Sequence, residues 1–275
     1  MATPLQKLIW PTTEQAYLRD GSALLAGPVV RIADAIGWTT APQVLTAYGL
    51  DAPDAPSVDV LRFRPSPLAQ LRVPSPGSPA AVAGHGNGFL RGAGVVPVWD
   101  IAPTEVPQGA EIWRIFADGR QELVSAYGGP AFGWRATAVF APPSMVVGPR
   151  AEWQGAEYRV SWIDETTVEL VTVGETAPEG FEQSRPHVFR RVVAAAECSR
   201  FFEDSFSAVW NGDVRCRVMQ FAEDEASVLL SVNAERAAAL EAVELEPGVY
   251  WKVVPRAELS EIRGVATELA PPVQS

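Results

Sequence analysis

The sequence is poor in the residue types that most often carry out chemistry. Its 275 residues include only two histidines, His85 and His187, and two cysteines, Cys198 and Cys216. The cysteines lack metal-ligand spacing and are too few for a disulfide framework, so we expect two small buried side chains. A zinc site is not expected from this set, and no Gly-x-Ser-x-Gly motif is present to expose a nucleophilic serine. The sequence therefore predicts neither a bound metal nor a cofactor.

Long apolar runs are also absent. No stretch approaches the roughly 20 apolar residues that a membrane-spanning helix needs. The start, MATPLQKLIWPTTEQ, lacks the apolar segment and the small-residue cleavage site of a secretory signal. We therefore expect a cytoplasmic protein that does not associate with a membrane.

Positive charge is scarce in one half of the chain. Residues 1–150 contain 11 basic and 11 acidic residues, whereas residues 151–275 contain 11 basic and 22 acidic residues. The whole net charge of −11 therefore lies in the second half. Nucleic acid is a poor partner, because phosphate binding needs clustered positive charge. A basic protein surface would be attracted instead, although an acidic surface can also serve solubility alone.

Three short helices are predicted within residues 12–49. The first has a capping-box pattern of Thr12 with Gln15. The second would begin at Pro28 and continue to Ile36 at helical spacing, and the third would begin at Pro42. A DNA-binding helix-turn-helix is not supported, because this half has no net positive charge to hold DNA.

A β-meander is predicted over residues 58–140. It follows a proline-rich linker at 51–57 and contains a long Pro/Gly-rich loop at 64–88. Asp118-Gly119 is a hairpin turn signal between two alternating runs. The breaker segment APPSMVVGP at 141–149 then marks a boundary, so we expect an N-terminal α+β domain over residues 1–145.

The second half contains a tandem repeat. WQGAEYRV begins at Trp153 and WNGDVRCRV begins at Trp210, and each is followed by a strand pattern, an acidic turn and a second strand. Val188 and Val249 then correspond, as do Glu197 and Glu258, at an offset of 61 residues. The sequence predicts a C-terminal domain, residues 150–275, of two related β-modules at about 151–206 and 208–270. The expected fold class is α+β and predominantly β.

These repeats resemble a known class of bacterial proteins. The relevant features are Trp-x-Gly with an alternating strand, then EGFE, then GVYWKVVPRAELSEI. These features are similar to modules of immunity proteins that guard against NAD-degrading polymorphic toxins. The resemblance covers about residues 150–270, and a segment of the first half, VVPVWDIAPTEVPQGAEIWRIFADGRQELVSAYGGPAFGWR, resembles stretches of actinobacterial proteins near such loci. The resemblance implies an intracellular, non-enzymatic protein that binds a cognate toxin and blocks the active site of that toxin.

The acidic turns are the expected contact surface for such a partner. They would present carboxylates to a basic face of the toxin, in place of an anionic substrate. The two repeat tryptophans have either a shared packing role or a role as interface anchors. The candidate interface residues are Trp153, Asp164, Glu165, Trp210, Glu223, Asp224 and Glu225.

An enzymatic alternative uses residues 58–135. Folds that transfer ADP-ribose begin with a strand arginine for the NAD phosphates and use a later glutamate. Arg62 and Arg64 in VDVLRFRP, with Glu111 or Glu122, could fill these roles, and His85 in AGHGNGF could belong to a ligand loop. That glycine-rich stretch does not match the spacing of a phosphate-binding or dinucleotide loop. A third hypothesis is an adaptor within a toxin or secretion locus.

Overall fold

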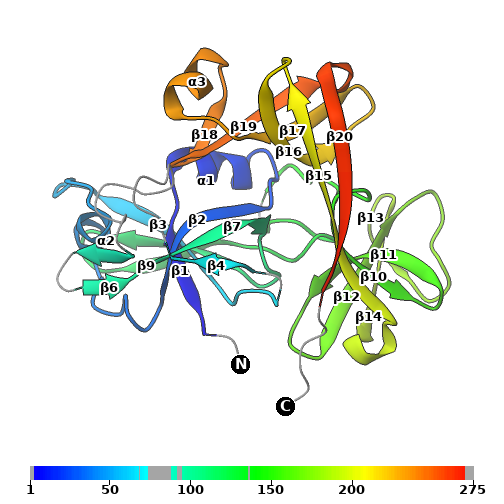
Figure 1. Ribbon diagram of the computed structural model, residues 1–275. Coiled ribbons are helices and arrows are strands. Elements are labelled where there is room, and N and C mark those ends of the chain that lie inside the picture. Colours follow the sequence, from blue (N-terminus) through cyan, green and yellow to red (C-terminus); the bar gives the residue numbers. More distant parts are fainter. Residues whose placement is uncertain (1–2, 68, 74–87, 92–94, 136, 270–275) are drawn as a thin grey trace. The chain divides into compact units, whose positions relative to one another are not determined.

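The computed structural model describes residues 3–67, 69–73, 88–91, 95–135 and 137–269 (Figure 1). Strands in antiparallel sheets predominate over helices, which confirms the predicted α+β, predominantly β fold class. The chain forms two compact units, and both are discontinuous in sequence. Unit 1 comprises residues 1–128, 133–140 and 244–249, and unit 2 comprises residues 129–132, 141–243 and 250–275. Within the described ranges, no helix has the length and hydrophobicity to cross a membrane.

Unit 1 is built on a seven-stranded sheet of order β4-β7-β2-β1-β3-β8-β9. The strands within residues 58–140 therefore do not form one continuous meander, because β1 and β2 lie between β7 and β3. The predicted hairpin at Asp118-Gly119 joins β8 to β9, and Gly119 has the positive φ that this turn requires. The elements of this part of the chain are β1 (Leu5–Leu8), α1 (Pro11–Leu18), β2 (Leu24–Arg31), α2 (Ala41–Ala47), β3 (Ser57–Phe63), β4 (Leu71–Arg72), β5 (Phe89–Arg91), β6 (Val95–Pro97), β7 (Trp99–Glu105), β8 (Glu111–Phe116) and β9 (Gln121–Ala126).

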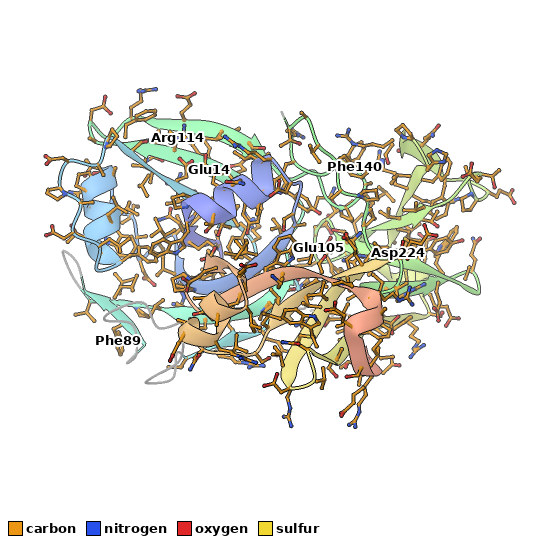
Figure 2. The ribbon with its side chains drawn as sticks, turned by 90° about the horizontal axis from the view of Figure 1, so that it is seen from above. Glu14, Phe89, Glu105, Arg114, Phe140 and Asp224 are labelled. Carbon is orange, nitrogen blue, oxygen red and sulfur yellow. The ribbon has the colours of Figure 1, made fainter. Side chains whose placement is uncertain are left out.

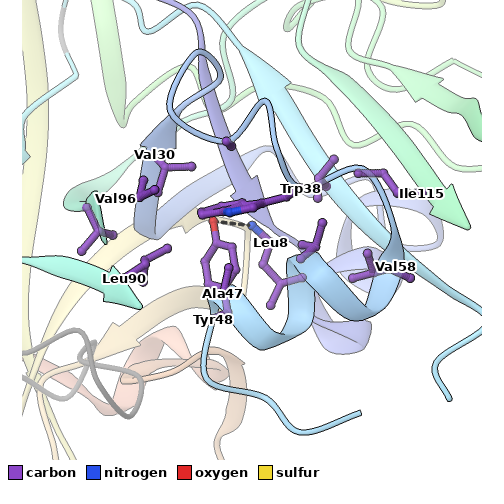
Figure 3. Packing of buried hydrophobic residues seen from close by; sticks show 14 residues of the cluster. Leu8, Val30, Trp38, Ala47, Tyr48, Val58, Leu90, Val96 and Ile115 are labelled. Atoms are coloured by element: carbon purple, nitrogen blue, oxygen red, sulfur yellow. Dashed lines mark hydrogen bonds between the residues drawn. The ribbon is translucent and has the colours of Figure 1, made fainter. Parts of the chain in front are cut away.

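Each face of this sheet has its own hydrophobic core. The core that includes Val30 of β2 packs against α2, where the Tyr48 hydroxyl accepts a hydrogen bond from the Leu8 N–H (Figure 3). The core that includes Val29 contains Tyr17 of α1, which stacks on Trp134. Adjacent residues of β2 thus point to opposite, equally buried faces.

The prediction of a helix from Pro28 to Ile36 is wrong. Residues Leu24–Arg31 form β2, and residues 32–37 are turns. Six consecutive residues of β2 are buried. A strand buried on both faces is a continuous apolar run, which periodicity cannot separate from a short buried helix. The first and third predicted helices are present as α1 and α2. Of the predicted loop 64–88, residues 68 and 74–87 lie outside the described residues.

Asp100 of β7 is a half-buried carboxyl group in unit 1. It lies opposite Pro28, which has no N–H to donate, and its Oδ1 has no hydrogen-bond partner among the described residues. Burial raises the pKa of Asp100 from its ordinary 3.8 to about 6. Protonated Asp100 therefore stabilises the fold below pH 4, and this contribution is lost as the pH rises through 6.

Asp100→Asn is expected to remove this pH dependence. At pH 7 the variant should have a free energy of unfolding about 1 kcal/mol higher than the native chain, after allowance for solvent screening of a half-buried group. Below pH 4 the two proteins should be equally stable. Urea unfolding between pH 4 and pH 8 measures both. A constant difference across this range would contradict the raised pKa.

A second sheet contains the same strand order twice, and most of its strands belong to unit 2. The first module has the order β10-β11-β12-β14-β13, and the second has the order β15-β16-β17-β19-β18. The first module consists of β10 (Gly148–Trp153), β11 (Ala156–Trp162), β12 (Thr167–Val173), β13 (Glu182–Arg185), β14 (Val188–Ala194) and the 3-10 turn η1 (Ala195–Glu197). The second module consists of β15 (Arg200–Trp210), β16 (Val214–Phe221), β17 (Glu225–Leu230), α3 (Ala234–Ala239), β18 (Val243–Glu246), β19 (Val249–Pro255), the 3-10 turn η2 (Arg256–Glu258) and β20 (Leu259–Glu268).

The two modules also agree in detail. Gln154-Gly155 and Asn211-Gly212 form the turns after the repeat tryptophans, with φ of 52° and 79° in the first and 52° and 80° in the second. Two successive positive φ values define a type I′ hairpin turn. The Arg191 guanidinium lies 4.6 Å from the ring centre of Trp153, and the Lys252 ammonium lies 5.8 Å from that of Trp210. The repeated phrase in the sequence therefore encodes twice the same turn and the same placement of a cation beside the tryptophan ring.

Candidate functional site

The acidic turn between β16 and β17 is exposed and carries three consecutive carboxylates. Glu223, Asp224 and Glu225 are all exposed, and Asp224 is labelled in Figure 2. The backbone closes the turn, because the Ala222 N–H donates to the Glu225 carbonyl and the Arg256 N–H donates to the Asp224 carbonyl. The three carboxylates have no hydrogen-bond or ion-pair partner within the described part of the chain. They are therefore available to bind a cationic group.

The equivalent turn of the first module, between β11 and β12, uses its aspartate differently. Asp164 Oδ1 accepts hydrogen bonds from the backbone N–H groups of Thr166 and Thr167, each at 2.8 Å, and from the Thr166 hydroxyl at 2.9 Å. The hydrogen bonds from Thr166 hold the pKa of Asp164 below its ordinary value. Asp164 thus stabilises its own turn, and Glu165 beside it is exposed. The second turn therefore offers more free carboxylate oxygens than the first.

Trp153 and Trp210 belong to the interior rather than to the contact surface. Trp153 is 3% exposed and Trp210 is 7% exposed. Trp153 makes edge contacts with Tyr158 and Phe181, and the Trp210 N–H donates to Glu258 at 2.8 Å. The prediction that these side chains are interface anchors is wrong, because an anchor must be reachable by the partner. Their shared packing role holds instead.

The residues of the enzymatic alternative are partly brought together. Arg62 and Glu111 lie opposite each other on β3 and β8. The Arg62 guanidinium donates to the side-chain oxygens of Gln6 and Gln121, each at 2.9 Å, and lies over the Trp113 ring. Glu111 accepts from the Trp113 N–H at 2.8 Å. Burial lowers the pKa of Arg62, against the opposing effect of Glu111.

Glu122, another member of that alternative, has a different partner. Glu122 pairs with Arg120, and both side chains are more than half exposed. Arg64 follows the end of β3 and is exposed, whereas His85 lies outside the described residues. In the region that the structure describes, no group of three or more histidines, cysteines or acidic residues is arranged to hold a metal ion. Arg62 and Glu111 thus both contact Trp113, and these contacts stabilise the sheet face.

A second polar network joins α1 to the same sheet. Arg114 of β8 donates to both carboxylate oxygens of Asp59 on β3 and to Glu14 of α1 (Figure 2). Burial and the neighbouring Asp59 raise the pKa of Glu14. The Arg114 guanidinium therefore pairs with the carboxylates of both Asp59 and Glu14. These ion pairs explain why the two carboxylates lie beside it, and no catalytic role is needed to explain their position.

One buried ionic cluster in unit 1 is not indicated by any sequence pattern. The Lys7 ammonium, which is fully buried, pairs with Glu246, which is 4% exposed. Thr13 of α1 donates to Glu246 at 2.9 Å, and Thr12 donates to the Leu245 carbonyl at 3.1 Å. Burial raises the pKa of Glu246, although Lys7 and Thr13 act in the opposite direction. These contacts hold residues 244–249 in unit 1.

The fold and the exposed groups thus define a predominantly β protein with a duplicated antiparallel module and acidic hairpin turns. Comparison of the chain with protein-family models, with curated proteins and with solved structures finds no match.

Proposed function

We propose that the protein is a non-enzymatic, cytoplasmic immunity or inhibitor protein that binds a toxin with a basic surface and occludes its active site. The observation that carries the proposal is the run of three exposed carboxylates at Glu223, Asp224 and Glu225, which have no partner among the described residues. The net charge of −11 over residues 151–275 adds a long-range attraction to a cationic partner.

The turn suits this role physically. A hairpin closed by backbone hydrogen bonds presents its side chains without first having to be ordered, so less conformational entropy is lost on binding. Carboxylates without internal partners do not have to give up an ion pair before they contact a lysine or arginine. Glu165, which is also exposed, lies in the equivalent turn of the first module.

Charge reversal at this turn tests the proposal. With a toxin domain that has a basic surface and binds the native chain as the probe, Glu223→Lys/Asp224→Lys/Glu225→Lys is expected to weaken binding by more than about tenfold. Binding to the native chain should also weaken as salt concentration rises, because exposed charges are screened. Isothermal titration calorimetry at two salt concentrations measures both effects.

A matched variant separates the turn from the total charge. Glu175→Lys/Glu179→Lys/Glu235→Lys changes three other exposed carboxylates and gives the same net charge. It should keep most of the affinity. Equal losses in the two variants would show that only bulk charge matters, and hydrolysis of NAD by the purified chain would overturn the proposal altogether.

A further inference from the structure

Asn211 begins the exposed turn between β15 and β16. Asn211, Gly212 and Asp213 are all exposed to solvent. Among the residues that the structure describes, neither the Asn211 side chain nor the Gly212 N–H has a hydrogen-bond partner. A side-chain amide and the backbone nitrogen that follows it are therefore both unprotected and in contact with water.

The connection that contains Asn211 is one residue longer than its counterpart in the first module. The pairing of Trp210 with Val214 leaves residues 211–213 between the strands, whereas the pairing of Trp153 with Ala156 leaves only two residues. Within the described part of the chain, none of the three residues donates a backbone hydrogen bond. Exposed segments with few hydrogen bonds open at the lowest free energy, so the backbone of this turn is free to rotate.

We propose that Asn211 is a deamidation site, at which the backbone nitrogen of Gly212 attacks the side-chain carbonyl carbon of Asn211. Water around the turn is the only co-reactant. Glycine has no Cβ, so its nitrogen approaches the carbonyl carbon without steric hindrance. The two reacting groups belong to adjacent residues, and an intramolecular attack avoids the entropy cost of bringing two molecules together.

The reaction is redox-neutral and its atoms balance. The Gly212 nitrogen gives its proton to hydroxide and forms a bond to Cγ of Asn211, and the bond from Cγ to Nδ2 breaks. Nδ2 leaves as ammonia with a proton taken from water, and a five-membered succinimide ring remains. Water then opens the ring at Cγ, which gives aspartate, or at the backbone carbonyl carbon, which gives isoaspartate. One amide and one water molecule have become one carboxylate and one ammonium ion.

Both products change the turn. Each places a new carboxylate near Asp213, which is paired with the Arg236 guanidinium at 3.3 Å. Isoaspartate also routes the main chain through the former side chain, so the connection between Trp210 and Val214 becomes one carbon atom longer. The isoaspartate product should therefore weaken the pairing of β15 with β16 at this end.

The first module provides an internal control. Gln154 occupies the position equivalent to Asn211, has the same φ of 52° and also precedes a glycine. Its side chain is one methylene longer, so the same attack would close a six-membered ring and fix one more rotatable bond. Gln154 should therefore react at least about tenfold more slowly than Asn211, because its reacting groups are less well positioned. The second module thus changes covalently with time, whereas the first does not.

Peptide mass spectrometry of the full, folded chain during incubation at pH 8 tests the proposal. Trypsin cleaves after lysine and arginine, so Asn211 lies in the peptide of residues 201–215, apart from Asn87, Asn233 and Gln154. This peptide should gain about 1 Da as the amide –NH2 is replaced by –OH. The aspartate and isoaspartate forms have the same mass and are separated by chromatography.

The other two asparagines are read in their own peptides. The Asn233 side chain accepts a hydrogen bond from the Arg236 N–H, and the next residue is alanine, so Asn233 should stay unchanged. Asn87 precedes Gly88 but lies outside the described residues. Its conversion would not be confused with that of Asn211.

Asn211→Gln is the matched variant, because it copies the residue of the first module into the second. The variant should fold as the native chain does, since Gln154 adopts the same φ, and its peptide should keep its mass. Conversion of the native chain should be slower at pH 6 than at pH 8, because the attacking nitrogen must first lose its proton. An Asn211 that stays intact in the folded chain would overturn the proposal. So would Gln154 converting as fast as Asn211, or a rate that does not change with pH. These results do not depend on toxin binding.

Discussion

Replacing Lys7 with methionine is expected to lower the free energy of unfolding by about 3–5 kcal/mol, because it leaves the carboxylate of Glu246 buried without its cation. Glu246 is 4% exposed, and its second oxygen already has no partner among the described residues. Removing the cation therefore leaves a buried charge whose remaining hydrogen-bond donor is the Thr13 hydroxyl. Urea unfolding followed by tryptophan fluorescence measures the loss.

The double variant Lys7→Met/Glu246→Leu is the control for this result. Two apolar side chains of similar volume remove both charges, and such replacements are often neutral or stabilising. The double variant should therefore be much more stable than either single variant. A double variant as unstable as the Lys7→Met protein would mean that packing, and not the uncompensated charge, causes the loss.

Replacing either repeat tryptophan with alanine should have an effect of similar size. Trp153→Ala and Trp210→Ala are each expected to cost about 3–5 kcal/mol, because each removes a large buried side chain and leaves a cavity. Equivalent positions in the two modules should give similar losses. Thermal and urea unfolding of the two variants measure this directly.

An exposed apolar residue provides the control. Ile36 is 79% exposed, and Ile36→Ala should change the free energy of unfolding by less than about 0.5 kcal/mol. If Trp153→Ala and Trp210→Ala are as stable as the native chain, the tryptophans do not have the packing role that their burial indicates.

The duplicated module could be predicted from sequence because its signals are local. Trp-x-Gly fixes a strand end and a turn with positive φ, and the alternating residues after it fix the next strand. The burial of Trp153 and Trp210 was harder to predict, since an aromatic residue beside a polar turn fits a core or an interface equally well. Their packing partners, such as Phe181 for Trp153, are brought into contact only by the folded sheet.

Two features of unit 1 could not be predicted from local patterns. β2 is buried on both faces, so its apolar residues satisfy helical spacing as well as strand spacing. Lys7 and Glu246 are separated by 239 residues, and each alone resembles an ordinary surface charge. Pairing at that distance depends on the complete fold, and one sequence contains no signal for it.

The assignment of residues 244–249 to unit 1 has a consequence for biosynthesis. When the ribosome has added Phe140, the N-terminal part of unit 1 has been made but Glu246 has not. At about 5–20 residues per second, residues 141–246 take on the order of ten seconds to add. During this interval the nascent chain contains Lys7 without its counter-ion, so unit 1 cannot reach its final stability until most of unit 2 has also been synthesised.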